Sequence, residues 1–136
     1  MNDADKYKLY FLTGSLDIGL IYVLTKKILP FADKTWIFST LLAHGAFFHA
    51  LKNKNRKVLD ILHYFVFALP VLSAFTKTIY PKILSLFLLL IIQFLWVIEN
   101  RCILNEKNQT LGFGDYTSIA TITLNTILSF QIGKMI

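Results

Sequence analysis

The sequence predicts an all-α membrane protein, a polytopic bundle of transmembrane helices. Hydrophobic residues make up 55% of the 136 residues and charged residues only 16%, and the mean hydropathy is +0.57. A soluble domain of this size could not cover so much apolar surface with polar side chains. We therefore expect a single integral membrane domain over residues 1–136. Its five predicted spans cover residues 9–25, 35–51, 60–76, 83–98 and 116–133.

The first two predicted spans are nearly free of charge. Residues 9–25 contain one charged residue, Asp17, and residues 35–51 contain none. The acidic amino terminus lacks the basic segment of a secretory signal, so we expect the first helix to be retained. Lys26 follows the first span directly, and the polar run 52–57 follows the second. Such charged flanks are typical of helix ends that reach the lipid headgroups.

The third and fourth predicted spans differ in their apolar character. Pro70 lies inside residues 60–76 and should kink that helix, because proline removes a backbone donor. Residues 83–98 form the most apolar segment and end at Glu99. Both segments are close to the shortest length that spans a bilayer, so we expect flanking aromatic and basic side chains to complete the crossing.

The fifth predicted span, residues 116–133, is uncharged but rich in hydroxyl and amide side chains. Its polar residues recur every three or four positions, which places them on one side of a helix. As a span, this segment would turn its polar side toward the bundle; the alternative is four spans plus a C-terminal helix at the membrane interface. The polar side consists of Ser118, Thr121, Asn125 and Ser129.

The distribution of basic residues predicts the orientation of the chain. The net charge is +6, but the basic residues flank apolar runs, so we expect contact with lipid headgroups and not with nucleic acid. The amino terminus and the loops after the second and fourth spans hold eight Lys and Arg residues, and the other two loops hold five. We therefore expect the amino terminus and the loop 52–57 on the cytoplasmic or an equivalent side.

Asp17 and His44 are the candidate functional pair. Each lies in the middle of its span and at a similar distance from the turn around Pro30, so an antiparallel hairpin would place them at one depth. A carboxylate at the bilayer centre costs about 2.5–3.5 kcal/mol and should face the protein interior. Ser15 and Gly19 bracket Asp17 as a candidate helix-packing pair of small residues.

Two interpretations of this pair remain open. An acid and an imidazole buried together can pass a proton or bind an ion, as in transporters. The pair can also be a hydrogen bond that fixes the register of two helices, and no continuous chain of polar groups leads away from it.

The three histidines suggest a haem or metal site as a further alternative. His49 and His63 should lie at similar depth on either side of the loop 52–57, and His44 lies deeper than His49. Histidines on adjacent helices can ligate haem or a metal, although solvated histidines at the interface are the simpler interpretation. The segment His44 to His49 resembles one histidine box of the membrane desaturase and hydroxylase family. That family needs several boxes to hold two irons, and three histidines cannot supply them.

The segment from Thr110 to Asp115 resembles the selectivity filter of potassium channels, which would imply backbone carbonyls that coordinate the ion. A filter follows an apolar pore helix, whereas residues 101–109 are polar and charged. The other interpretation is a glycine turn in which Asp115 caps the next helix.

The function that this sequence predicts is a structural or assembly subunit of a larger membrane complex or a membrane-containing particle. The spans leave only short loops outside the bilayer, and twelve Phe and six Tyr residues offer contact area inside it. We expect the bilayer and other membrane subunits, or a second copy, as partners. The alternative is a proton or small-solute transporter or channel module that uses Asp17 and His44. No catalytic constellation is evident, so we expect neither enzymatic activity nor a cofactor.

Overall fold

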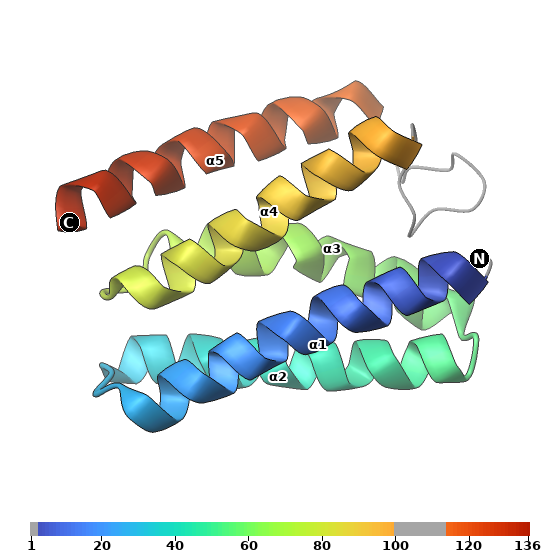
Figure 1. Cartoon of the computed structure of the whole chain (residues 1–136), viewed down its shortest axis with the longest axis horizontal. Coiled ribbons are helices and arrows are strands. Elements are labelled where there is room, and N and C mark those ends of the chain that lie inside the picture. The colour runs from blue at the N-terminus through green and yellow to red at the C-terminus, as the bar shows by residue number, and fades with distance from the viewer. Residues whose placement is uncertain (1–2, 100–113) are drawn as a thin grey trace.

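The computed structural model describes residues 3–99 and 114–136, and every regular element within these ranges is a helix (Figure 1). The all-α prediction is therefore confirmed. Consecutive helices run in opposite directions, so short turns connect α1 to α2, α2 to α3 and α3 to α4. The helices are α1 (Asp3–Lys26), α2 (Phe31–Lys52), α3 (Arg56–Ser73), α4 (Ile79–Glu99) and α5 (Gly114–Met135).

Local sequence signals explain where these helices begin and end. Asp3 and Asp5 lie in the first turn of α1, where carboxylates stabilise the positive end of the helix dipole. Pro30 precedes α2 in an extended conformation that no helix interior contains. Asn55 caps α3, because its side-chain oxygen accepts a hydrogen bond from Val58 N at 3.3 Å. Each of the first three helices therefore has a local sequence signal at its start.

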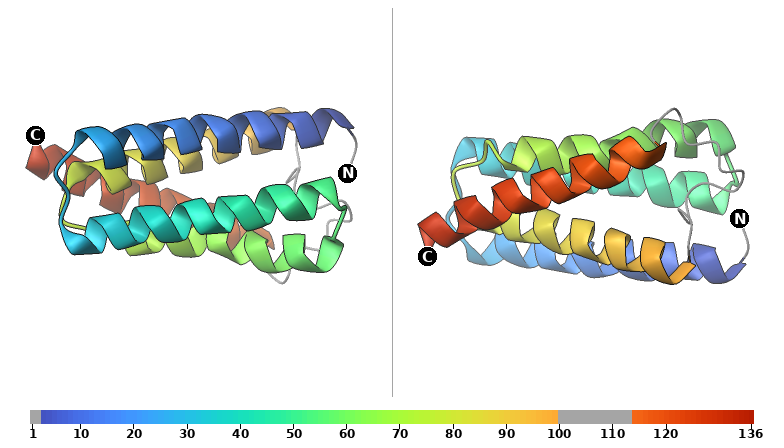
Figure 2. Two further views of the ribbon diagram at one scale, coloured as in Figure 1. Left: turned by 90° about the horizontal axis from the view of Figure 1, so that it is seen from below. Right: turned by 90° about the horizontal axis from the view of Figure 1, so that it is seen from above.

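Helices α1 to α4 close on one another, and α5 lies outside them. Each helix packs on its neighbour in the chain, α1 and α2 also contact α4, and α5 contacts only α3 and α4 among the described residues. Figure 2 shows α5 crossing α3 and α4 obliquely. The core residues form three groups, near the turn after α2, near the turn after α1, and under α5. The first contains Leu9, Ala50, Leu51 and Leu59; the second Leu20, Val23, Leu29, Trp36 and Ile37; the third Leu89, Leu124 and Leu128.

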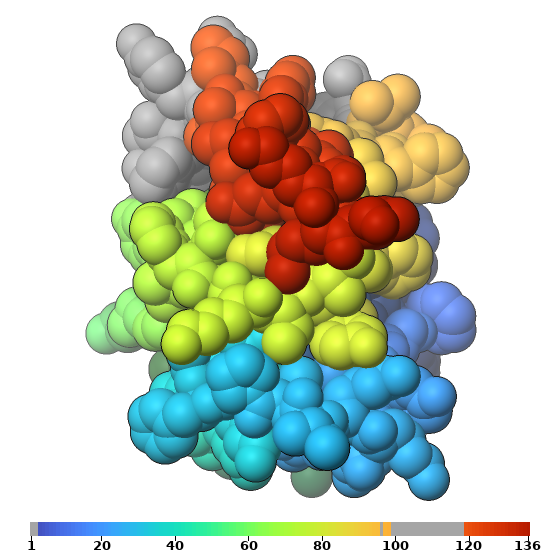
Figure 3. Space-filling view, turned by 90° about the vertical axis from the view of Figure 1, so that its left-hand side faces the viewer, coloured from blue at the N-terminus to red at the C-terminus, as the bar shows by residue number. Residues whose placement is uncertain are grey.

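Different turns lie at the two ends of the bundle. The amino terminus and the turn between α2 and α3 lie at one end (Figure 1). Figure 3 shows the other end of the bundle. There the turn from α1 to α2 lies next to the turn from α3 to α4, and the end of α5 lies on the far side of the second turn. This arrangement places the amino terminus and loop 52–57 together, as the orientation prediction requires; the side of a membrane that they face stays a prediction.

One described helix, α1, is both long and apolar enough to cross a membrane. Helix α4 has a shorter apolar stretch, Ile79–Leu95. Helices α2, α3 and α5 do not combine length and apolar character in this way within the described residues. The described structure thus contains a five-helix bundle, while five membrane crossings and the division into one integral domain stay predictions.

Candidate functional site

The structure brings Asp17 and His44 together. Asp17 Oδ1 of α1 and His44 Nδ1 of α2 lie 2.5 Å apart, in direct hydrogen-bond contact. Their side chains are 20% and 15% exposed, so most of each is covered by the protein. The hairpin accounts for the common depth of the two residues, and the rotation of each helix turns them toward each other. The pair can therefore share a proton or form an ion pair.

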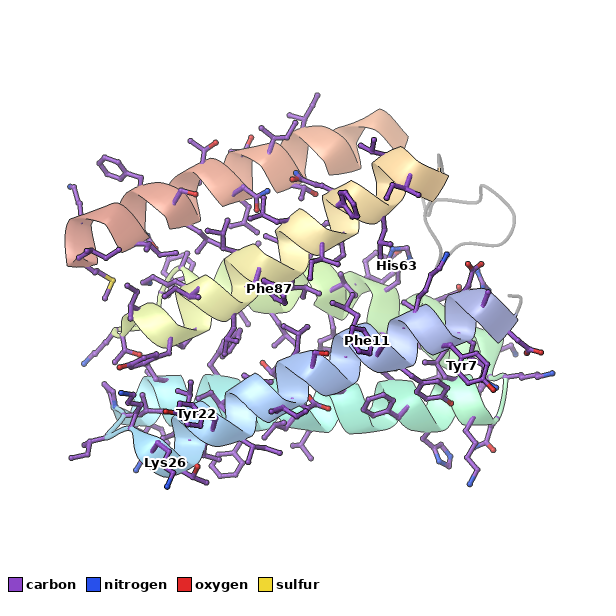
Figure 4. The ribbon with its side chains drawn as sticks, viewed as in Figure 1. Tyr7, Phe11, Tyr22, Lys26, His63 and Phe87 are labelled. Carbon is purple, nitrogen blue, oxygen red and sulfur yellow. The ribbon has the colours of Figure 1, made fainter. Side chains whose placement is uncertain are left out.

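A central cavity of about 100 Å³ lies beside this pair, between α1, α2, α3 and α4. Its wall is mainly aliphatic and aromatic, with His44 and His63 among its few polar side chains. Figure 4 shows His63 among the side chains that fill the interior. The wall also includes three hydroxyl residues, one each from α1, α2 and α4: Thr13, Thr40 and Ser85.

The two small residues that bracket Asp17 do not form a joint contact. A Cβ atom added to Gly19 would lie 3.1 Å from a methyl carbon of Leu84, so α4 approaches α1 closely there. Ser15 is exposed, and its hydroxyl donates to Phe11 O at 2.8 Å. Within this chain Gly19 therefore lies against a neighbouring helix and Ser15 lies on the outer side of α1; a helix-packing role of the pair stays a prediction.

The three histidines lie in two different surroundings. His49 is exposed, and its Nε2 accepts a hydrogen bond from Asn53 Nδ2 at 2.9 Å. His63 lines the cavity together with His44, and its ring lies over Phe67 with centroids 6.4 Å apart. His49 and His63 therefore lie in different environments, because the rotation of α3 turns His63 toward the cavity; their similar depth in a membrane stays a prediction. Within residues 3–99 and 114–136, no three His, Cys, Asp or Glu side chains gather as metal ligands would.

A second polar cluster, which we did not predict from the sequence, lies at the end of the bundle shown in Figure 3. Asp33, fully buried at the start of α2, accepts hydrogen bonds from the backbone of the turn between α3 and α4. Its Oδ1 accepts from Lys77 N at 2.8 Å, and its Oδ2 accepts from Thr78 N at 2.8 Å and from the Thr78 hydroxyl. One carboxylate thereby attaches α2 to the beginning of α4.

Lys82 binds the same turn from its other side. Its Nζ donates to the carbonyl oxygens of Ser73, Ala74 and Thr76 at 3.1, 3.0 and 2.9 Å, and the side chain is 3% exposed. These oxygens lie at the end of α3, where a helix leaves carbonyls without intrahelical partners. Sequence reasoning had treated this lysine as a headgroup contact, because no local pattern links a lysine to a turn that precedes it.

The contact between α4 and α5 includes a polar pair. Asn125 Nδ2 donates to Gln93 Oε1 at 2.9 Å, and Thr121 is buried on the same side of α5. Ser129 is exposed, so the expectation that it faces the bundle with the other polar residues is wrong. The side chain of Ser118 lies outside the described residues. The filter-like segment 110–115 also lies outside them, apart from the first two residues of α5.

Comparison of the chain with family models, with curated proteins and with solved structures found no match.

Proposed function

We propose that this chain is a multi-pass membrane protein whose five helices all cross the bilayer as one integral domain. The supporting observation is the apolar exterior of the bundle. Tyr7 and Phe11 of α1 are 72% and 79% exposed, and Tyr22 and Phe87 are also exposed and labelled in Figure 4. Soluble monomers rarely expose apolar patches beyond a few hundred Å². A lipid environment accounts for this surface.

The distribution of polar groups supports the same proposal. The buried side chains include Asp33, Lys82, Ser85 and Thr121, and each of these lies within or at the end of the bundle. A bilayer favours this arrangement, since a polar group that faces hydrocarbon loses its hydrogen bonds with water. The exposed side chains of α5, by contrast, include Ile119, Ile122, Ile127 and Phe130.

Within the membrane, the function that we propose is structural: the chain is a subunit of a larger membrane assembly or of a membrane-containing particle. The described residues outside the helices form only short turns, which offer little surface for a soluble partner. Exposed aromatic side chains provide large contact areas for neighbouring helices. The partners are therefore lipids and other membrane subunits, or further copies of this chain.

Affinity purification of the tagged chain in mild detergent tests the subunit proposal. We expect stoichiometric membrane partners, or a defined homo-oligomer, to remain bound through size exclusion. A homogeneous monomer would contradict the proposal. An unrelated tagged membrane protein of similar size, purified from the same source, controls for non-specific association.

Labelling of single cysteines in intact membranes tests the membrane proposal separately. Cys102→Ser removes the only native cysteine. Single cysteines introduced at Asn2, Lys54, Lys77 or Ile136 then show on which side of the membrane each position lies. Five crossings require that positions 2 and 54 are labelled from one side, and positions 77 and 136 from the other. Labelling of position 136 together with position 54 would contradict a spanning α5.

The contact between Asp17 and His44 favours a second candidate function, a proton or small-solute transport module. An acid and an imidazole within one bundle can hold and release a proton between them. Purified chain in liposomes should then show a proton flux that Asp17→Asn abolishes and Asp60→Asn, at a half-exposed position on α3, preserves. Flux that survives Asp17→Asn would exclude the relay.

A further inference from the structure

Ser85 carries a buried hydroxyl group that has no hydrogen-bond partner among the described residues. The residue lies on α4, is 2% exposed, and lines the central cavity. A serine in a helix commonly donates to the carbonyl four residues earlier. Thr40, on the wall of the same cavity, does so, with its hydroxyl 2.8 Å from Trp36 O. The hydroxyl of Ser85 does not, although burial of an unpaired hydroxyl is unfavourable.

The cavity beside this hydroxyl has lining residues along much of α1. On α1 its wall extends from Leu9 to Leu20, which corresponds to about 16 Å along the helix axis. A volume of about 100 Å³ distributed over such a length suits a thin molecule better than a ring. An engineered cavity of about 150 Å³ binds benzene, so the volume is also too small for a whole lipid chain.

We propose that the central cavity binds a short, unbranched aliphatic molecule with one hydroxyl or carbonyl group, which hydrogen-bonds to Ser85. The aliphatic wall would contact the hydrocarbon part, and the otherwise unpaired Oγ atom would orient the polar part. A subunit role does not require such a site, so this proposal stands or falls independently of the proposed function.

Two structural features make the ligand class specific. A water molecule needs two to four polar partners, and along most of its length the cavity wall offers leucine, isoleucine and phenylalanine side chains. An ion would require several charged or carbonyl ligands, whereas among the described lining residues the titratable groups are the imidazoles of His44 and His63. A single apolar chain with one polar group matches one unpaired hydroxyl in an apolar tube.

Trp36 provides a local readout, because it lines the cavity and its indole nitrogen donates to Leu69 O at 2.8 Å. The chain has two tryptophans, so Trp96→Phe leaves Trp36 as the sole tryptophan, whose emission is excited selectively above the absorption of tyrosine. The probe is 4-bromobutan-1-ol, whose bromine quenches tryptophan emission, and 1-bromobutane is the matched probe without the hydroxyl. The full-length chain is titrated in mild detergent with each probe.

The alcohol should quench Trp36 saturably, and Ser85→Ala should weaken its binding about 3- to 10-fold, the value of one hydrogen bond. 1-Bromobutane should bind both proteins with affinities that agree within about twofold, since it cannot use the hydroxyl. Ser15→Ala makes the same chemical change on the exterior and should leave both affinities unchanged. Ala43→Leu, and Leu88→Phe as a second filling variant, should abolish saturable quenching by both probes, because both positions line the cavity.

Three results would overturn the proposal. Quenching that rises linearly, without saturation, would show partition into the micelle only. Equal affinity of the alcohol for the parent protein and for Ser85→Ala would exclude the hydrogen bond. Saturable quenching that persists in both filling variants, with each variant folded by circular dichroism, would place the probe outside the cavity.

Discussion

Asp17 Oδ1 of α1 and His44 Nδ1 of α2 lie 2.5 Å apart in the middle of the first helical hairpin. Each side chain is largely covered by the protein, so the hydrogen bond between them replaces hydrogen bonds with water. The contact fixes the register of α1 against α2, since a shift by one residue would turn the two side chains away from each other.

Removal of either member of this pair should destabilise the bundle. Asp17→Ala leaves the imidazole without its acceptor and should lower the free energy of unfolding by about 1–3 kcal/mol. A double-mutant cycle of Asp17→Leu and His44→Leu should give a coupling energy of about 0.5–3 kcal/mol, measured by denaturant titration in mild detergent. The matched cycle with exposed His49 in place of His44 should be additive. Additivity in both cycles would show that the close contact contributes nothing to stability.

Asp33 should be the most sensitive carboxylate for stability. Asp33→Ala removes the acceptor of three donors in the turn between α3 and α4, two of them backbone amides, and should cost about 3 kcal/mol. The control is Asp60→Ala, which breaks a half-exposed ion pair with Arg56 and should cost less than about 1 kcal/mol. Thermal unfolding of both variants in the same detergent gives the comparison. Equal effects would contradict a special role of Asp33.

Replacement of Lys54 by glycine should stabilise the fold. Its φ of 53° lies in the left-handed region, which costs a residue with a side chain about 1–2 kcal/mol. Glycine adopts this conformation freely but loses more entropy on folding, so Lys54→Gly should raise the free energy of unfolding by about 0.5–1 kcal/mol. Lys54→Val should lower it, because a β-branched residue tolerates this region least. A glycine variant less stable than the parent would show that the side chain of Lys54 makes a favourable contact.

The polar pair between α4 and α5 should show an asymmetric response. Gln93→Leu leaves the Asn125 amide without a partner, and its Oδ1 is already unpaired, so the variant should lose about 1–3 kcal/mol. Gln93→Leu combined with Asn125→Leu should recover most of this loss, since neither polar group then remains buried. Ser129→Ala, at an exposed position of α5, should stay within about 0.5 kcal/mol of the parent. A double variant as unstable as the single one would contradict this account.

Much of the helical architecture could be predicted from apolar runs and their charged flanks. The equal depth of Asp17 and His44 also followed from the sequence, because distance from the turn sets depth in an antiparallel hairpin. Whether they face each other depends on rotation about each helix axis, which a uniformly apolar helix does not reveal. The same uncertainty in rotation explains why the position of His63 in the cavity wall could not be predicted.

The cluster around Asp33 could not be predicted, because it depends on contacts between distant segments. Asp33 and Thr78 are 45 residues apart, and nothing near either residue signals the other. In the sequence, Asp33 and Lys82 look like ordinary charged residues at helix ends. The central cavity could not be predicted either, since it depends on how side chains from four helices fill the space between them.

The position of α5 has a consequence for the order in which the protein assembles. Within the described residues, α1 and α2 make no contact with α5, so the first four helices can close while the last is still being synthesised. Until α5 arrives, Gln93 has no amide partner on that surface. Asn125 completes this interface when α5 packs on α3 and α4, so we expect α5 to dock after the first four helices have closed.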